Sequence, residues 1–250
     1  MKNLFKNSII LILGLIVLGL TGFDVHSFAN FTDTGISMAI GAAMLPRDRA
    51  LFKHLKAKYP EATPSPSYLR IEQALSNSKG VYEFRFMKTD NEAITEVKLD
   101  RNDVFVVTDL AVYLLAQDST KIGMGVLQTF VNQQVFASAT GFTPTHLETI
   151  YSGKLELKVG DKINIAALSM QEFRVVPETQ QSSSTNLSQS YTQLAKYKPD
   201  TLIYLRGDGN NVVTIQFPTF SGMAIAAVAS NTTNKLVFHP YGYLIRNAAR

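Results

Sequence analysis

Carboxylates are the residues whose types and spacing could support catalysis in this chain. Glu148 and Glu156 fall on neighbouring predicted strands, and Glu172 and Glu178 lie near a predicted loop. Paired carboxyl groups can hydrolyse a glycosidic bond, one as acid and the other as nucleophile or base. However, β-rich proteins carry exposed carboxylates routinely, and no Gly-x-Ser-x-Gly or phosphate-binding glycine motif accompanies these four. We therefore expect no enzymatic activity.

Metal and cofactor chemistry finds little support in the remaining residues. The chain has no Cys, which excludes disulfides and thiolate metal sites. No two histidines have a ligand spacing such as i, i+4; the four are His26, His54, His146 and His239. Arg206-Gly207-Asp208 spells an adhesion tripeptide, but it falls in a predicted hairpin turn, where these residue types are common. We expect no cofactor and no bound metal.

The elements that precede the β-rich region begin with a hydrophobic leader, residues 1–29. Lys2 and Lys6 precede 17 uncharged residues, whose centre, Ile9 to Leu20, contains only Ile, Leu, Val and Gly. This length is at the short limit for a helix that spans a bilayer. The same pattern, followed by Ser27-Phe28-Ala29, fits a signal peptide with a small-x-small cleavage site. The leader is therefore either a membrane-inserting helix or a cleaved signal.

Residues 30–66 are predicted to form an amphipathic helical arm and a proline-rich linker. Pro46 suits the first turn of a helix, and Pro60 ends it. At 100° per residue, one arc of this helix is apolar (Leu51, Phe52, Leu55 and Tyr59) and another is basic (Arg49, Lys53 and Lys56). The basic stripe could face lipid headgroups or packaged nucleic acid, or it could simply be a solvated helix face. Glu61 to Ser67 should be a stiff linker.

From residue 68 the hydrophobic period shortens towards two, which indicates β-strands. Turns are expected at Asp100–Asp103 and Gly160-Asp161, and Pro177–Pro199 reads as a long polar loop. The clearest hairpin joins Thr201–Arg206 to Val212–Phe217. The other predicted strands are Val81–Phe86, Ile94–Leu99, Val104–Ala116 (bent near Thr108), Val126–Val131, Leu147–Tyr151, Lys154–Val159, Lys162–Ala166, Phe173–Val176, Met223–Ala229 and Lys235–Ile245.

These strands predict an all-β domain over residues 67–250. Nine to eleven strands without βαβ alternation suit one two-sheet antiparallel sandwich of the jelly-roll type, or a related Greek-key barrel. An immunoglobulin-like sandwich is the nearest competitor, but the Cys and Trp of its antibody version are absent. Charged residues make up 18%, below the roughly 25% that is usual for soluble domains. A weakly charged surface is expected where much of it is buried against neighbours.

Several short sequence segments of the β-region resemble those of a known family. They are Ser67–Gln73 (SYLRIEQ), Asn102–Leu110 (NDVFVVTDL), Val126–Phe130 (VLQTF), Ile150–Leu155 (IYSGKL) and Phe173–Gln180 (FRVVPETQ). Over about residues 67–246 the chain resembles jelly-roll capsid proteins of small tailless icosahedral phages of Bacteroidetes-type hosts. The hydrophobic leader departs from that pattern, since capsid arms that touch the genome are normally basic and polar. A virion with an internal lipid layer would reconcile the two.

The resemblance implies a virion structural protein that assembles with copies of itself and with other virion proteins. Residues 8–23 would then contact a lipid membrane, and any contact with nucleic acid would be weak or indirect, since the net charge is only +4. The alternative is a secreted or surface-anchored β-sandwich that binds glycans or host proteins after cleavage behind Ala29. A mature N-terminus at Asn30 would favour secretion, and one at Met1 or Lys2 would favour retention of the arm.

Overall fold

The computed structural model describes residues 46–89, 93–121, 123, 125–132, 135–136, 145–176, 195–228 and 231–248. The predicted leader (1–29), the arm before Pro46 and most of the predicted loop Pro177–Pro199 lie outside these residues. The chain divides into two compact units between Lys58 and Tyr59, and each is described by itself.

The first unit contributes one described helix, α3 (Pro46–Lys58), where the sequence predicted one. Proline is favoured in the first helical turn because its missing N–H has no partner there in any case. Leu51 and Leu55 are buried, whereas Lys53 and Lys56 are exposed. Asp48 in the first turn and Lys58 in the last complement the helix dipole.

The second unit contains eleven strands in the described residues, arranged as two antiparallel layers. The first layer is a bent sheet whose two parts have the orders β1-β11-β4-β8 and β2-β10-β5. Its strands are β1 (Ser65–Tyr68), β2 (Ile71–Ala74), β4 (Val104–Asp109), β5 (Val112–Asp118), β8 (Ile203–Arg206), β10 (Thr232–Phe238) and β11 (Tyr241–Ile245).

The two parts of this bent sheet are continuous, because three long strands run through both of them. Each is interrupted by two residues at the same level of the sheet: Leu69-Arg70, Leu110-Ala111 and His239-Pro240. Hydrogen bonds persist across the bend, from Leu69 N to Pro240 O (2.9 Å) and between His239 and Ala111 in both directions (2.9 and 3.1 Å). Pro240 has no N–H to donate, which accounts for the break in the last strand.

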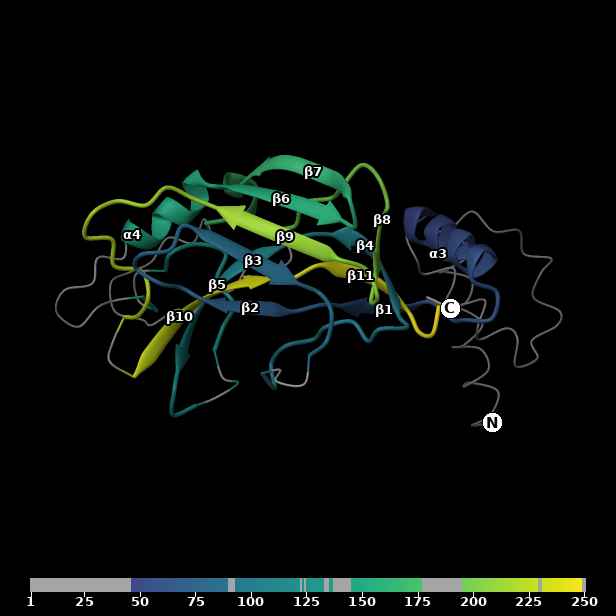
Figure 1. Cartoon of the computed structure of the whole chain (residues 1–250), viewed down its shortest axis with the longest axis horizontal. Coiled ribbons are helices and arrows are strands. Elements are labelled where there is room, and N and C mark those ends of the chain that lie inside the picture. Colours follow the sequence, from purple (N-terminus) through teal and green to yellow (C-terminus); the bar gives the residue numbers. More distant parts are fainter. Residues whose placement is uncertain are drawn as a thin grey trace, which may run out of the picture. The chain divides into compact units, whose positions relative to one another are not determined.

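The second layer is a four-stranded sheet with the order β3-β9-β6-β7. Figure 1 shows its strands side by side: β3 (Val81–Arg85), β9 (Asn211–Gln216), β6 (Lys154–Val159) and β7 (Lys162–Ser169). Alternate residues of β3, β9 and β6 are buried, as expected for strands with one face on a core. Gly160 has a φ of +59° in the β6–β7 turn, a left-handed conformation that glycine adopts without strain.

The strands pair in a nested order. If each interrupted pair is counted as one strand, eleven strands become eight, four in each layer. The first of the eight (β1/β2) pairs with the last (β11/β10), and the second (β3) with the seventh (β9). The third (β4/β5) pairs with the sixth (β8), and β6 pairs with β7. The chain is thus a long antiparallel hairpin folded over on itself.

Aromatic side chains join the two layers in the core. Phe238 of the first layer lies 5.9 Å, between ring centroids, from both Phe84 of β3 and the nearby Phe86. Within the second layer, Tyr82 of β3 stacks on Phe217, which follows β9, at 5.5 Å. These residues belong to one continuous cluster of buried side chains drawn from both sheets. The expectation of an all-β, two-sheet antiparallel domain is therefore confirmed.

Two predicted strands are helical turns instead. Leu147–Tyr151 lies in α4 (Thr145–Glu148) and in the 3-10 helix η2 (Thr149–Ser152). Its buried residues, Leu147, Ile150 and Tyr151, have the i, i+3, i+4 spacing of a helix. Phe173 ends a second 3-10 helix, η3 (Met170–Phe173), and the predicted strand Phe173–Val176 is wrong.

Three further predicted strands are replaced by irregular segments. Ile94–Leu99 contributes only isolated bridges, at Val97 and Leu99, and Val126–Val131 contributes one at Gln128. The described part of Met223–Ala229 is irregular and is held by the side chain of Asn77, whose Oδ1 accepts from Ile225 N (2.7 Å) and Ala226 N (2.8 Å). Ser65–Tyr68, partly assigned to the linker, is strand β1.

Gly242 permits the close approach of β11 to β4 beside a bulge. A Cβ atom there would overlap the carbonyl oxygen of Val106. This is a backbone atom, so it cannot move aside without disturbing the sheet. We expect Gly242→Ala to lower the free energy of unfolding by roughly 2–4 kcal/mol. Gly160→Ala, where nothing lies within 4 Å, should lose only about 1–2 kcal/mol from backbone strain. Equal losses in urea denaturation would contradict this.

Candidate functional site

One of the carboxylates considered for catalysis does not lie in the element that the sequence suggested. Glu148 lies in α4, so the prediction that it occupies a strand next to that of Glu156 is wrong. The carboxylate of Glu148 lies 3.7 Å from the guanidinium of Arg174 in a partly exposed ion pair. Glu172 lies in η3, and Glu178 is outside the described residues.

The basic stripe predicted at Arg49, Lys53 and Lys56 lies on α3. Lys53 and Lys56 are exposed and Arg49 is half-buried. The three cations therefore occupy a different side of the helix from the buried Leu51 and Leu55. The helix can present positive charge to a surface, but nothing in this geometry distinguishes lipid from nucleic acid.

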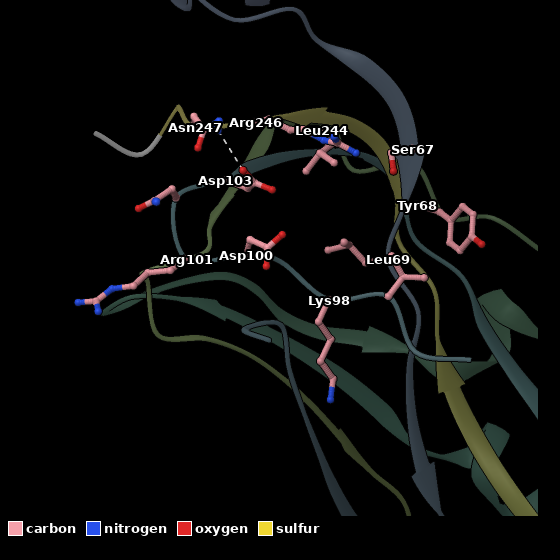
Figure 2. A pocket seen from close by; sticks show the side chains of 12 residues that line it. Ser67, Tyr68, Leu69, Lys98, Asp100, Arg101, Asp103, Leu244, Arg246 and Asn247 are labelled. Carbon is pink, nitrogen blue, oxygen red and sulfur yellow. Dashed lines mark hydrogen bonds between the residues drawn. The ribbon is translucent and has the colours of Figure 1, made fainter. Parts of the chain in front are cut away.

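A polar recess of about 650 Å³ lies beside the loop between Lys98 and Val104 (Figure 2). It is lined from three segments of the chain: Ser67–Leu69 at the end of β1, Val97–Asp103 (except Leu99), and Leu244, Arg246 and Asn247 at the end of β11. In Figure 2, Arg101 extends away from the other lining residues. The recess thus lies at the end of β1, the end of β11 and the loop that leads into β4.

Asp103 holds this recess in shape. Its carboxylate accepts a hydrogen bond from the backbone N–H of Asn247 (2.9 Å), and its carbonyl accepts one from Gly207 N (2.8 Å). Asn247 has a φ of +55°, a left-handed conformation that asparagine tolerates better than most residues. Gly207 is required as glycine, since a Cβ would collide with the carbonyl oxygen of Asp100. Asp103 therefore serves as a structural clamp.

The charges around the recess are largely matched by neighbours. Lys98 pairs with Glu96 (3.0 Å), and Lys88 lies 3.6 Å from Asp100. A second recess of about 800 Å³ shares Asp100 and Arg101 and is also lined by Asp208. Cations and carboxylates alternate along both, so neither presents a strong field of one sign.

The two charged side chains of the Arg-Gly-Asp tripeptide are paired with each other. The guanidinium of Arg206 donates two hydrogen bonds to the carboxylate of Asp208, both 2.9 Å long. The hydrogen bonds from Arg206 lower the pKa of Asp208 below its usual value. An adhesion loop must offer both charges to a receptor, whereas here they are held against each other at the β8–β9 turn.

A buried histidine marks the bend of the first sheet. His239 is 6% exposed and stacks on Tyr68, with ring centroids 4.8 Å apart. Tyr241 (4.5 Å) and Tyr113 (5.8 Å, edge-on) complete an aromatic enclosure. Lys196 lies 3.8 Å from the ring centroid of Tyr241, a cation–π contact on the same cluster.

This enclosure keeps His239 neutral. Burial, reinforced by the positive charges of Arg70 and Lys196, lowers the pKa of His239 to about 4 from its usual 6.5. Its Nδ1 is buried and has no hydrogen-bond partner. A protonated imidazole would therefore lose its hydration without gaining an acceptor at Nδ1.

A buried ion-pair network lies on the strand that follows the bend. The carboxylate of Glu72 is 2.7 Å from both Arg70 and Lys235, so it links β2 to β10. Burial alone would raise the pKa of Glu72, but hydrogen bonds from Lys235 and Thr95 and the charges of Lys235 and Arg70 lower it below its usual value. This pair ties the first strand of the domain to the last.

Comparison with protein-family models gives no match, and comparison with curated proteins gives none either. Among the described residues, no group of three or more His, Asp or Glu is arranged to hold a metal ion. Within the same residues, no helix has the length and apolar character needed to cross a bilayer. What the structure defines is an antiparallel two-sheet β-sandwich whose recesses have matched charges.

His239 should make the stability of the sandwich depend on pH. Because its pKa is lower in the folded than in the unfolded state, the unfolded chain binds more protons between pH 6.5 and about 4. The free energy of unfolding should therefore fall by up to about 3 kcal/mol as the pH is lowered through that window. We expect His239→Phe to abolish this loss in chemical denaturation series. The further acid loss from Glu72, below about pH 4.5, should remain in the variant.

His146→Phe is the matched control. A comparable loss of stability in the two variants between pH 6.5 and 4 would show that His239 is not the titrating group.

Proposed function

We propose that this protein is a virion structural protein, a capsid subunit with a single jelly-roll domain that assembles with copies of itself. The observation that carries the proposal is the nested strand order. The N-terminal arm would face lipid or the shell interior. No enzymatic step is proposed.

The strand order supports the jelly-roll assignment. A jelly roll has eight strands in two four-stranded sheets joined by Greek-key connections, and it is common in viral capsids as well as in lectin domains. Here the first strand pairs with the last, the second with the seventh and the third with the sixth. This is the arrangement expected when a long hairpin is rolled into a double sheet. An immunoglobulin-like sandwich would instead pair successive strands within each sheet more often.

The surface of the sandwich supports assembly. Large apolar side chains remain exposed in the single chain, among them Ile94 (88%), Ile163 (58%) and Met87 (48%). Apolar groups of this size are stabilised when a neighbour covers them. The recesses beside Asp100 and Arg101 have charges of both signs, which suits contact between subunits with complementary surfaces. These features favour a subunit over an isolated binding module.

The arm supports a lipid contact. Residues 8–23 are uncharged and apolar, and the exposed Lys53 and Lys56 follow them on α3. An apolar segment together with a basic helix further along the same chain suits insertion into a bilayer and binding of its anionic headgroups. Lipid is therefore the occupant that we propose for the arm, in preference to nucleic acid.

Assembly is the direct test of the proposal. Full-length protein purified in detergent should form closed particles of uniform size when the detergent is exchanged for phospholipid, as seen by negative-stain electron microscopy. A monodisperse monomer at high concentration, with its arm intact, would contradict the proposal. Native protein that begins at Asn30 would instead support the secreted binding module.

The basic stripe predicts a dependence on anionic lipid. We expect Lys53→Glu with Lys56→Glu to weaken binding of the full-length chain to phosphatidylglycerol vesicles at least tenfold, since each cation near such a surface contributes about 1 kcal/mol. Flotation of the vesicles measures the bound fraction. Lys154→Glu with Lys158→Glu makes the same change of charge at two exposed lysines of β6 and is the control. Equal binding by both double variants would show that the stripe does not face lipid.

A further inference from the structure

The edges of the two sheets differ in how well they are protected from pairing with another chain. In the described part of the chain, the edge strands are β1, β2, β5 and β8 in the bent sheet and β3 and β7 in the second sheet. An exposed edge offers unpaired N–H and C=O groups to any strand that approaches it. Proteins that remain monomeric shorten such edges, place charge or proline in them, or cover them.

Most of these edges carry such protection. β8 has only four residues and ends at Arg206. The edge formed by β1 and β2 contains Pro66 and is covered at the bend, where Arg70 exchanges two backbone hydrogen bonds with Val97. β3 has an ion pair between Glu83 and Arg85 (3.2 Å) on its exposed face. β5 is covered near its centre, because Leu114 exchanges two backbone hydrogen bonds with Gln128.

Apart from irregularities in its pairing with β6, strand β7 lacks these protections. It has eight residues, no proline and a single charge, that of Lys162 at its first position. Only two of the eight residues, Ile165 and Leu168, are half-buried and pack on the core; the others are exposed, including Ile163 at 58%. Its ladder with β6 contains two register shifts, which bend the strand but leave Ile163 in solvent. In the described residues, β7 pairs with β6 and with no other strand.

We propose that β7 is an assembly edge, at which it pairs in antiparallel orientation with β7 of a second copy of this chain. This inference rests on the proposed function, because it names the surface through which subunits would join. The two β3-β9-β6-β7 sheets would become one continuous eight-stranded sheet, within the usual size of open sheets.

The distribution of charge favours a second copy as the occupant. In an antiparallel pair centred near Ala166, the two Lys162 side chains would lie at opposite ends, roughly 25 Å apart along the strands. That distance exceeds the screening length of about 8 Å at physiological salt, so the repulsion between them is small. A parallel pair would place the two lysines side by side. The antiparallel contact is also self-complementary, as a two-fold interface must be.

The absence of cysteine from the sequence makes this pairing easy to test. Ala166→Cys and Ala167→Cys introduce single thiols near the centre of β7, and their side chains point to opposite faces of an extended strand. One of them therefore suits a pair centred on either of these two residues. In the assembled full-length protein, a short thiol-to-thiol cross-linker should convert at least one variant mostly to covalent dimer. Val81→Cys, exposed on the opposite edge strand β3, should give at least tenfold less.

A second substitution tests the same edge without thiols. Ile163→Lys changes an exposed residue, so we expect the fold, measured by circular dichroism and thermal unfolding, to be unchanged. In the Ala166→Cys or Ala167→Cys background it should reduce dimer yield at least tenfold, because it replaces an exposed apolar side chain that pairing would cover with lysine, a residue that blocks pairing at natural sheet edges. Val81→Lys should have no such effect.

The outcomes separate this inference from the proposed function. Particles that form without cross-linking through β7, or cross-linking that Ile163→Lys leaves unchanged, would overturn the pairing while self-assembly stands. If no particles form, the proposed function fails, and the cross-link is then measured on the soluble protein. A covalent dimer through β7 in that case would still support the pairing, and its absence would reject it.

Discussion

Pairing between the two ends of the domain is the interaction on which the other contacts depend. Residues 65–74 form the strand that lies beside residues 232–245, and the ion pair of Glu72 with Lys235 crosses this seam. Without the last strand, β4 and β5 lose the neighbour that holds them in the bent sheet. Phe238, which joins the two layers, also belongs to this strand. Contacts of such long sequence separation form late and slow folding, because loop closure must precede them.

The regular elements were predictable where one physical signal dominated. Val81–Phe86 alternates without interruption, and Gly160-Asp161 is a strong turn signal, so β3 and the β6–β7 hairpin lie where they were expected. The misses arose where two signals competed. Leu147, Ile150 and Tyr151 have helical spacing inside a segment that also reads as β-rich. The irregular segment after Met223 is fixed by contacts from elsewhere, including His146 Nδ1, which accepts a hydrogen bond from Ala224 N (3.2 Å); no local pattern encodes such partners.

The candidate surfaces were less accessible to sequence reasoning than the fold. The recess around Asp103 draws its lining from three segments that are distant in sequence, so only the strand order could have brought them together. His239 was visible as a single histidine before Pro240, and the proline was a usable signal for the break in its strand. Its enclosure by Tyr68 and Tyr113 depends on two other strands, so the sequence alone could not predict it. The edge character of β7 likewise emerges only when every other edge is known.

Ser65 lies opposite Leu244, so the polypeptide enters and leaves the sandwich at one place. Fluorophores attached at Ser65 and Leu244 would therefore lie close together only while these two strands are paired. Loss of energy transfer between them would report the opening of the two ends of the domain directly.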